Sequence, residues 1–142
     1  MTAHVGGPET EAQVLARHAR YLDGWRTGAA SMFRIAADEA PSGVGTLGYW
    51  QIEWEGAPVY EAGWGTLPQY QGMGVASRGV ILMLQHAREH GTRDEVHAFP
   101  SPDHPASNRV CRKAGFELRG PVDFEYPKGN PVISNDWVFR LR

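Results

Sequence analysis

A glycine-rich segment between an expected strand and the strongest expected helix is the first place where this sequence could do chemistry. The segment reads Gln69-Tyr70-Gln71-Gly72-Met73-Gly74-Val75-Ala76. The first turn of a helix leaves backbone N–H groups without intrahelical acceptors and carries partial positive charge, which suits it to bind phosphate. Gly72 and Gly74 have no side chain to keep a pyrophosphate away from the backbone. The segment therefore predicts an anion site at the start of the helix.

Two well-known phosphate-binding motifs do not match this segment. A Walker loop needs a Lys followed by Ser or Thr after its last glycine, whereas Gly74 is followed by Val75 and Ala76. A dinucleotide-binding fingerprint needs a third glycine at the position that Ser77 occupies. A purely structural alternative stays open, in which the two glycines only satisfy the geometry of a strand-to-helix turn.

Apolar periodicity and turn residues predict the elements that must position this segment. The helix after the glycines is indicated by an apolar stripe formed by Ala76, Val80, Met83, Leu84 and Ala87. The expected elements in chain order are a helix over 10–25, a strand over 31–36, a Pro- and Gly-containing turn over 39–45, strands over 46–55 and 59–67 joined by a hairpin turn, a helix over 75–90 ended by Gly91, a strand over 95–99, a helix over 104–114, and a closing hairpin of strands over 116–124 and 132–141.

This order of elements predicts an α/β (α+β) fold in a single domain over residues 1–142. Hairpins give antiparallel pairs at both ends of a mixed central sheet. The strand-helix-strand crossover from 59 to 99 gives a parallel pair in its middle, and helices flank the sheet.

A second segment adds a pattern of its own. It reads His104-Pro105-Ala106-Ser107-Asn108-Arg109-Val110-Cys111-Arg112-Lys113-Ala114-Gly115-Phe116. It resembles the N-x-x-S-x-x-V-x-x-K-x-G-F segment of the ribosomal-protein N-terminal acetyltransferases, the RimJ/RimL-like branch of the GNAT superfamily. The Q-x-x-G-x-G of residues 69–74, directly after Leu67-Pro68, is similar to the acyl-CoA signature of that superfamily. With Gly63-Trp64, the resemblance runs from about residue 31 to residue 142.

The resemblance implies an N-acetyltransferase (EC 2.3.1.-) that uses acetyl-CoA as cosubstrate and a primary amine as acceptor. The two parallel strands would splay apart, and the pantetheine arm would lie in the gap. Backbone groups of Thr66 and Leu67 would hold pantetheine, with the Leu67 N–H as the candidate oxyanion donor. The implied cofactor-binding residues are Thr66, Leu67, Gln69, Gln71, Gly72, Met73, Gly74, Val75, Ala76, His104 and Ser107.

Attack of an amine on a thioester requires a base and an acid. Glu61, on the strand that leads into the site, is the first candidate base, and its alternative is a solvent-facing sheet glutamate. His97 is the second, because imidazole titrates near neutral pH, and its alternative is a structural role. Many relatives have a Tyr acid where this sequence has Cys111, which we expect in the core instead. Ser107 is therefore the acid or thiol-contact candidate, against an alternative of helix-start hydrogen bonding.

The second segment also departs from the family at its first residue. The family's Asn is His104 here, which puts the usual amide contact to CoA in doubt, although an imidazole can still donate one hydrogen bond.

Composition and charge exclude several other classes of protein. Fourteen Lys and Arg against sixteen Asp and Glu give a formal charge of −2, which argues against a nucleic-acid partner. The single Cys111 excludes an internal disulfide and a cysteine zinc cluster and suits a reducing compartment. No run approaches the roughly 18 apolar residues of a membrane span, and the start lacks the pattern of a signal peptide. We expect a cytoplasmic protein without a membrane partner or a metal, and an unpaired sheet edge suits a homodimer.

Two other functions stay open alongside the acetyltransferase. One is a non-catalytic acyl-CoA-binding or regulatory module, suggested by the absent Tyr and by a short N-terminus. Family members usually begin with a strand and a helix before the helix expected at 10–25, and the sequence offers no room for them. The other is a nucleic-acid-binding α/β domain, which the net charge disfavours. The acceptor is left open among a protein N-terminus, a small amine and an antibiotic.

Overall fold

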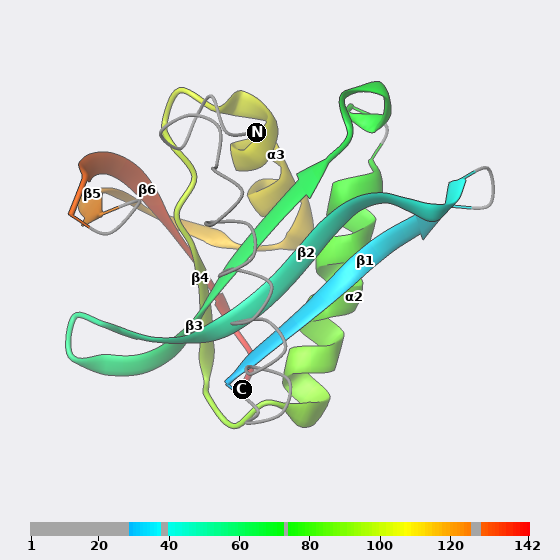
Figure 1. Ribbon diagram of the computed structural model, residues 1–142. Helices are drawn as coiled ribbons and strands as arrows, with labels where there is room; N and C mark the ends of the chain where they lie inside the picture. Colours follow the sequence, from blue (N-terminus) through cyan, green and yellow to red (C-terminus); the bar gives the residue numbers. More distant parts are fainter. Residues whose placement is uncertain (1–28, 38–39, 73, 126–128) are drawn as a thin grey trace.

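The computed structural model describes residues 29–37, 40–72, 74–125 and 129–142 (Figure 1). The helix expected over 10–25 lies outside these residues. The elements in chain order are β1 (Ala30–Ala37), β2 (Ala40–Trp54), β3 (Ala57–Thr66), the 3-10 helix η2 (Pro68–Tyr70), α2 (Val75–His90), β4 (Glu95–Ala98), α3 (Pro105–Ala114), β5 (Glu117–Glu125) and β6 (Pro131–Arg140). The strands and helices expected in this part of the chain are confirmed, and β2 alone starts well before its expected first residue.

The turn expected over 39–45 is wrong for the described residues, because β2 already begins at Ala40. Ile35 pairs with Gly45 and Ala37 with Ala40, so the register between β1 and β2 shifts and β2 carries extra residues there. Gly43 lies in this bulge with a φ of +118°, which a residue with a side chain rarely adopts. A bulge thus accommodates the Pro and Gly that would otherwise indicate a turn.

The six strands form one mixed sheet in the order β1-β2-β3-β4-β6-β5. All neighbouring pairs are antiparallel except β3 and β4, which are parallel and connected through α2. The predicted fold class, a mixed sheet with antiparallel ends and a parallel pair in the middle, is confirmed.

Helices α2 and α3 pack against one face of the sheet and bury the core there (Figure 1). The sheet contributes Tyr49, Tyr60 and Ala62. Tyr60 and Ala62 alternate along β3 and Tyr49 is the partner of Ala62 on β2, so all three side chains point to the same face. The helices contribute the buried residues Val80, Met83, Leu84, Ala87, Cys111 and Ala114. Glu61, between two core residues of β3, consequently points to the opposite face.

The parallel pair is short and then splays. Pairing between β3 and β4 joins Tyr60 to Val96 and Glu61 to His97. Beyond this point β3 continues to Thr66, whereas β4 follows β6, with Ala98 paired to Trp137 (Figure 1). The expected divergence of the two strands is therefore present, and it leaves one edge of β3 facing a gap.

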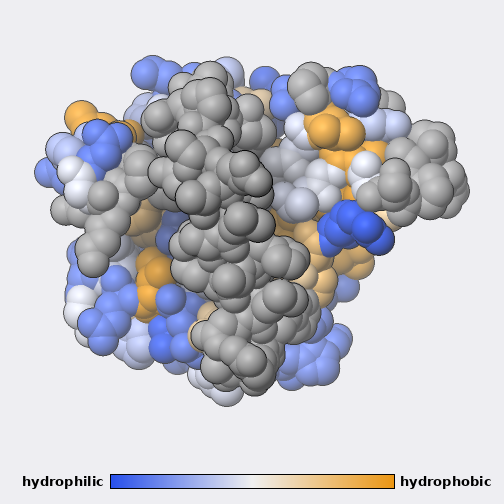
Figure 2. All heavy atoms as spheres, viewed as in Figure 1, coloured by the Kyte–Doolittle hydropathy of each residue, from blue (hydrophilic) through white to orange (hydrophobic). Residues whose placement is uncertain are grey.

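No helix within the described ranges combines the length and apolar character needed to cross a membrane. On the face shown in Figure 2, hydrophobic residues are visible in separate patches beside hydrophilic ones. Among the described residues, the exposed large apolar side chains are Leu67, Ile81, Leu82, Leu118 and Ile133. Ile81 and Leu82 are neighbours in α2, and the other three lie on separate segments.

Candidate active site

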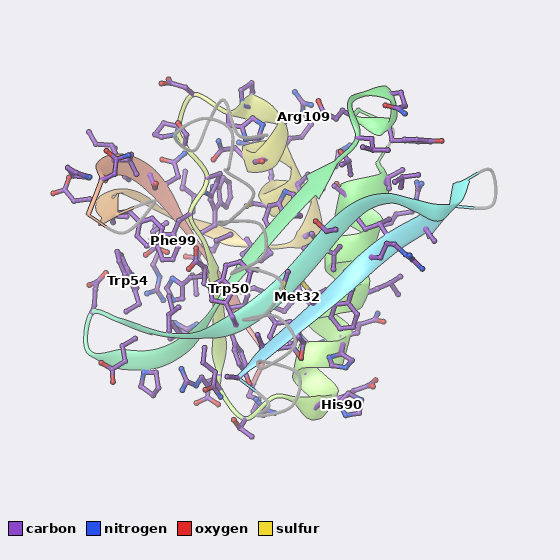
Figure 3. The ribbon with its side chains drawn as sticks, in the orientation of Figure 1. Met32, Trp50, Trp54, His90, Phe99 and Arg109 are labelled. Carbon is purple, nitrogen blue, oxygen red and sulfur yellow. The ribbon has the colours of Figure 1, made fainter. Side chains whose placement is uncertain are left out.

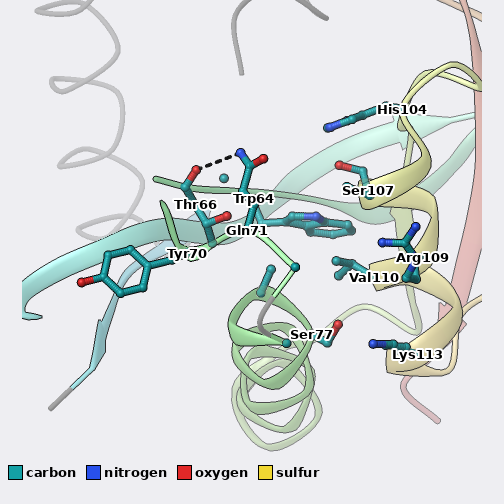
Figure 4. Close-up of a pocket in the computed structure, with 15 residues that line it drawn as sticks. Trp64, Thr66, Tyr70, Gln71, Ser77, His104, Ser107, Arg109, Val110 and Lys113 are labelled. Atoms are coloured by element: carbon teal, nitrogen blue, oxygen red, sulfur yellow. Dashed lines mark hydrogen bonds between the residues drawn. The ribbon is translucent and has the colours of Figure 1, made fainter. Parts of the chain in front are cut away.

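A cleft opens where β3 leaves β4, between the end of β3, the start of α2 and one side of α3 (Figure 4). Two stretches of chain that are distant in sequence line it. The first contributes Trp64, Gly65, Thr66, Tyr70, Gln71, Gly72, Gly74, Ala76 and Ser77, and the second contributes His104, Ala106, Ser107, Arg109, Val110 and Lys113. The crossover connection brings these segments together, because it returns the chain to the same end of the sheet.

The glycine-rich turn forms one wall of the cleft and requires its two glycines. Gly72 and Gly74 have φ values of +79° and +77°, in the left-handed region that favours glycine. A Cβ built on Gly72 would meet nothing within 4 Å, and one on Gly74 would meet only Arg78 Nη1, at 3.3 Å. The Gln71 side chain donates to the Thr66 carbonyl across 3.3 Å and closes the turn. The backbone is thus open to a ligand at the N-terminus of α2.

Most of the residues predicted to bind the cofactor gather in this cleft. Those that line it are Thr66, Gln71, Gly72, Gly74, Ala76, His104 and Ser107. Leu67, Gln69 and Val75 do not, because they lie beside it in the turn and at the first residue of α2. Met73 lies outside the described residues.

The assignment of the Leu67 N–H as a free oxyanion donor is wrong. This N–H donates a 2.8 Å hydrogen bond to the Val44 carbonyl of β2. The early start of β2 is the cause, because it brings Val44 opposite the end of β3. In an antiparallel pair, N–H groups alternate between the two edges of a strand, so those of Trp64 and Thr66 face the gap.

The cleft is electropositive although the chain is not. Arg109 and Lys113 lie one helical turn apart on α3 and line the cleft, and none of the described lining residues is acidic. Helix α2 also has no acidic residue in its first turn. Sequence reasoning missed Arg109 and Lys113, although their four-residue spacing in the 104–116 segment was an available signal.

Trp64 is a further lining residue to which the sequence analysis assigns no role. Its indole extends from β3 toward α3 across the cleft (Figure 4). Its Nε1 is buried and has no hydrogen-bond partner in the described structure. An unsatisfied buried donor is costly, and a ligand atom in this cleft would offer it an acceptor. This donor, the open glycine backbone and the two cations together fit a phosphorylated ligand with amide and thioester carbonyls, as acetyl-CoA has.

Glu61 lies further back on β3, on the sheet face opposite the core. The Trp50 indole N–H on β2 donates to Glu61 Oε1 across 3.0 Å. Burial raises the pKa of Glu61 to about 7, and the Trp50 hydrogen bond opposes part of that rise. A carboxyl that titrates near neutral pH can accept a proton under physiological conditions.

His97, the other candidate base, is held in a buried charge network. Its Nδ1 lies 2.6 Å from Asp136 Oδ1 and its Nε2 lies 3.2 Å from Glu95 Oε1. Carboxylate oxygens accept hydrogen bonds, so this arrangement fits a protonated imidazole, which donates from both ring nitrogens. Burial alone would lower the pKa of His97, but the hydrogen bonds and charges of the two carboxylates outweigh it and raise the pKa. This arrangement leaves no lone pair for a substrate proton and favours the structural alternative.

The remaining predicted residues lie on α3. Cys111 is fully buried in the core, as expected, and burial raises the pKa of its thiol far above the usual range. Ser107 lines the cleft and is 8% exposed. His104 is the N-cap residue of α3, and its carbonyl accepts a 3.2 Å bond from the Asn108 N–H.

Comparison with known proteins agrees with this architecture. The chain shares 32% identity over 75 residues with YnaD of Bacillus subtilis, an uncharacterized N-acetyltransferase. That match covers 53% of this chain and 44% of YnaD, so it spans less than half of that relative. Among solved structures, the ribosomal-protein-S5-alanine acetyltransferase of Vibrio fischeri superimposes with a TM-score of 0.80 at 17% identity, over 97% of this chain and 79% of that one.

A second solved structure was determined with coenzyme A bound. It is RimL, a ribosomal L7/L12 alpha-N-protein acetyltransferase, with a TM-score of 0.76 at 21% identity, over 93% of this chain and 73% of that one. At these identities the two structures show a shared fold. Residues 1–117 match the acetyltransferase (GNAT) domain, and the chain therefore belongs to the GNAT acetyltransferase family, as the two sequence motifs predicted.

Proposed function

We propose that this protein is an acetyl-CoA-dependent N-acetyltransferase that transfers an acetyl group to a primary amine. The observation that carries the proposal is the electropositive cleft at the fork of β3 and β4, with its open glycine turn at the start of α2. Membership of the GNAT family and the fold shared with a CoA-bound RimL support it.

In this proposal different residues of the cleft bind different parts of the cofactor. The turn from Gln71 to Ala76 holds the pyrophosphate through backbone N–H groups, and Arg109 and Lys113 add charge for the phosphates. Pantetheine lies along the free edge of β3. The N–H groups of Trp64 and Thr66 on this edge replace the Leu67 N–H as candidate donors to the thioester carbonyl.

Glu61 is the proposed base. The amine nitrogen forms a bond to the thioester carbon, the carbon–sulfur bond breaks, and Glu61 accepts the proton that the amine loses, directly or through water. Because the pKa of Glu61 is about 7, its carboxylate form predominates above that pH. Ser107 is the proposed contact of the departing sulfur, which its hydroxyl can stabilise or protonate.

The alternative of a non-catalytic acyl-CoA-binding module has one specific observation in its favour. Cys111 occupies the position of the family's Tyr acid and is fully buried with a raised pKa, so it cannot supply a proton. A protein that keeps the cleft without an effective acid would bind CoA and not turn over.

Release of free thiol from acetyl-CoA in the presence of a panel of amines separates the two functions. The panel contains peptides with free N-termini, polyamines and aminoglycosides, each paired with its N-acetylated form as a control. We expect thiol release with at least one free amine of the panel and none with its N-acetylated form. Binding of CoA without release on any acceptor supports the module, and absence of CoA binding contradicts both.

Three further predictions have their own tests. We infer a single domain over residues 1–142, a cytoplasmic protein and, from the edge strands of the sheet, a homodimer. Limited proteolysis followed by mass spectrometry tests the first, cell fractionation the second and gel filtration with light scattering the third. Elution as a monomer only would contradict the dimer.

A further inference from the structure

The fork between β3 and β4 has a specific residue at its branch point. His97 is the last residue of β4 that pairs with β3, opposite Glu61. Continuing the same register would pair Ala62 with Ala98 and Gly63 with Phe99, and this longer ladder would close the gap. The gap therefore depends on whatever directs β4 away from β3 immediately after His97.

The side chain of His97 joins β4 to the strand on its other side. His97 is 1% exposed and Asp136 of β6 is 2% exposed, and their 2.6 Å contact is a buried charged hydrogen bond. The chain beyond β4 also follows β6, since the Asn135 N–H donates to the Pro100 carbonyl across 2.9 Å. Phe99 then stacks on Phe124 of β5, with ring centroids 4.4 Å apart.

Breaking a buried charged pair by removing one partner is strongly unfavourable, because the other charge is left uncompensated. Such a pair favours one arrangement of its strands over competing ones. We propose that the His97–Asp136 pair is the positioning device that directs β4 to β6 and so keeps the gap along β3 open for the acyl-CoA arm. This inference rests on the proposed function.

Three charged or titratable groups face His97, and a fourth group contacts one of them. Asp136 faces it from β6, Glu95 from its own strand, and Glu61 is its register partner on β3. Arg119 of β5 lies 3.5 Å from the second oxygen of Glu95. Deprotonation of His97 would turn one of its donors into an acceptor facing a carboxylate, so CoA affinity should fall as pH rises through the His97 pKa. The pH series is measured in a Glu61→Gln background, which removes the second group that titrates nearby.

The test compares Asp136→Asn with Arg119→Gln, a control at the exposed end of the same network. Calorimetric titration with CoA is expected to show affinity at least ten-fold weaker in Asp136→Asn and unchanged in Arg119→Gln. Hydrogen exchange is expected to slow at the Trp64 and Thr66 amides of Asp136→Asn as β4 closes onto β3. The double variant His97→Gln/Asp136→Asn restores a neutral hydrogen-bonding pair and is expected to recover most of the affinity.

Each outcome decides between this role and a merely structural one. If Asp136→Asn only unfolds at lower temperature, while its CoA affinity and the exchange of Trp64 and Thr66 match the parent protein, the inference is wrong. If Asp136→Asn does not fold, the double variant decides, and a folded double variant without CoA affinity likewise overturns the inference. Failure of the unsubstituted protein to bind CoA would contradict the proposed function instead.

Discussion

The Trp50 indole N–H donates a 3.0 Å hydrogen bond to Glu61 Oε1 across the β2–β3 pair. The two residues are direct partners in the register, so the sheet itself sets their approach. Burial raises the pKa of Glu61 to about 7, whereas this bond stabilises the carboxylate and lowers it. The balance of the two effects leaves a carboxyl that titrates near neutral pH on the face of the sheet opposite the helices.

Replacing Trp50 with Phe should move the pH dependence of turnover. The substitution keeps an aromatic side chain at position 50 but removes the N–H that favours the charged form of Glu61. The pKa of Glu61 then rises further, and the rising limb of the rate–pH profile shifts to higher pH. A profile of acetyl-CoA turnover from pH 5 to pH 9 checks this, and a shift to lower pH would contradict it.

Replacing Gly74 with Trp should abolish CoA binding. A side chain here is strained by the left-handed backbone, and it would stand in the turn that is proposed to hold the pyrophosphate. The matched control is Gly56→Trp, also at a left-handed glycine but in the β2–β3 hairpin turn, with open space around it. Calorimetry should show CoA binding in the control only, and unchanged affinity in Gly74→Trp would refute the phosphate cradle.

Neutralising Arg109 and Lys113 together should weaken CoA binding in a salt-dependent way. Both line the cleft, whereas Arg112 on the same helix lies over the Trp137 ring, with 5.9 Å to its centroid. The double variant Arg109→Gln/Lys113→Gln should lose roughly ten-fold in affinity at low salt and less at high salt, because exposed charges are screened. Arg112→Gln serves as the control, and an equal loss in it would show that the effect is not specific to the cleft.

Among the described residues, the buried indole N–H groups of Trp64 and Trp54 have no hydrogen-bond partner, and together they offer a matched pair for testing contact with the cofactor. Trp64 lines the cleft, whereas Trp54 packs against Phe99 between the β2–β3 and β5–β6 hairpins (Figure 3). A net hydrogen bond contributes about 0.5 to 1.5 kcal/mol, so Trp64→Phe should bind CoA about three- to ten-fold more weakly. Trp54→Phe should bind it normally. In spectra of the indole N–H groups, CoA should shift the Trp64 resonance downfield, and an unmoved resonance would contradict the contact.

Much of the fold follows from local patterns in the sequence. The apolar stripe from Ala76 to Ala87, with glycines at both ends, predicted α2 with the bounds that the structure shows. Glycine at position 91 is required for a reason other than the left-handed conformation that is usual at the end of a helix. The Gly91 backbone is extended, and a Cβ there would lie 2.5 Å from the Ala87 carbonyl oxygen. The glycine turn and the His104 to Phe116 segment located the cleft because both motifs lie at helix starts.

The features of the site that were not predicted depend on hydrogen bonds between residues that are far apart in the sequence. Whether the Leu67 N–H faces the cleft or β2 is decided by its register with Val44, which alternation of side chains does not indicate. The role of His97 depends on Asp136, which lies 39 residues away. Local propensity carries no information on such pairings. The bulge near the start of β2 was not predicted because it contains Pro and Gly, which are typical of turns.

The central claim is that Glu61 accepts the amine proton in an acetyl transfer, and thiol release measured against pH in Glu61→Gln tests it most directly. Glu53→Gln, an exposed glutamate of β2, is the control. The unsubstituted protein should gain activity as pH rises through about 7, where Glu61 becomes a carboxylate. Glu61→Gln should lose roughly 10²- to 10⁴-fold in rate and this pH step, with near-normal CoA affinity. Undiminished turnover in Glu61→Gln across the pH range would contradict the account.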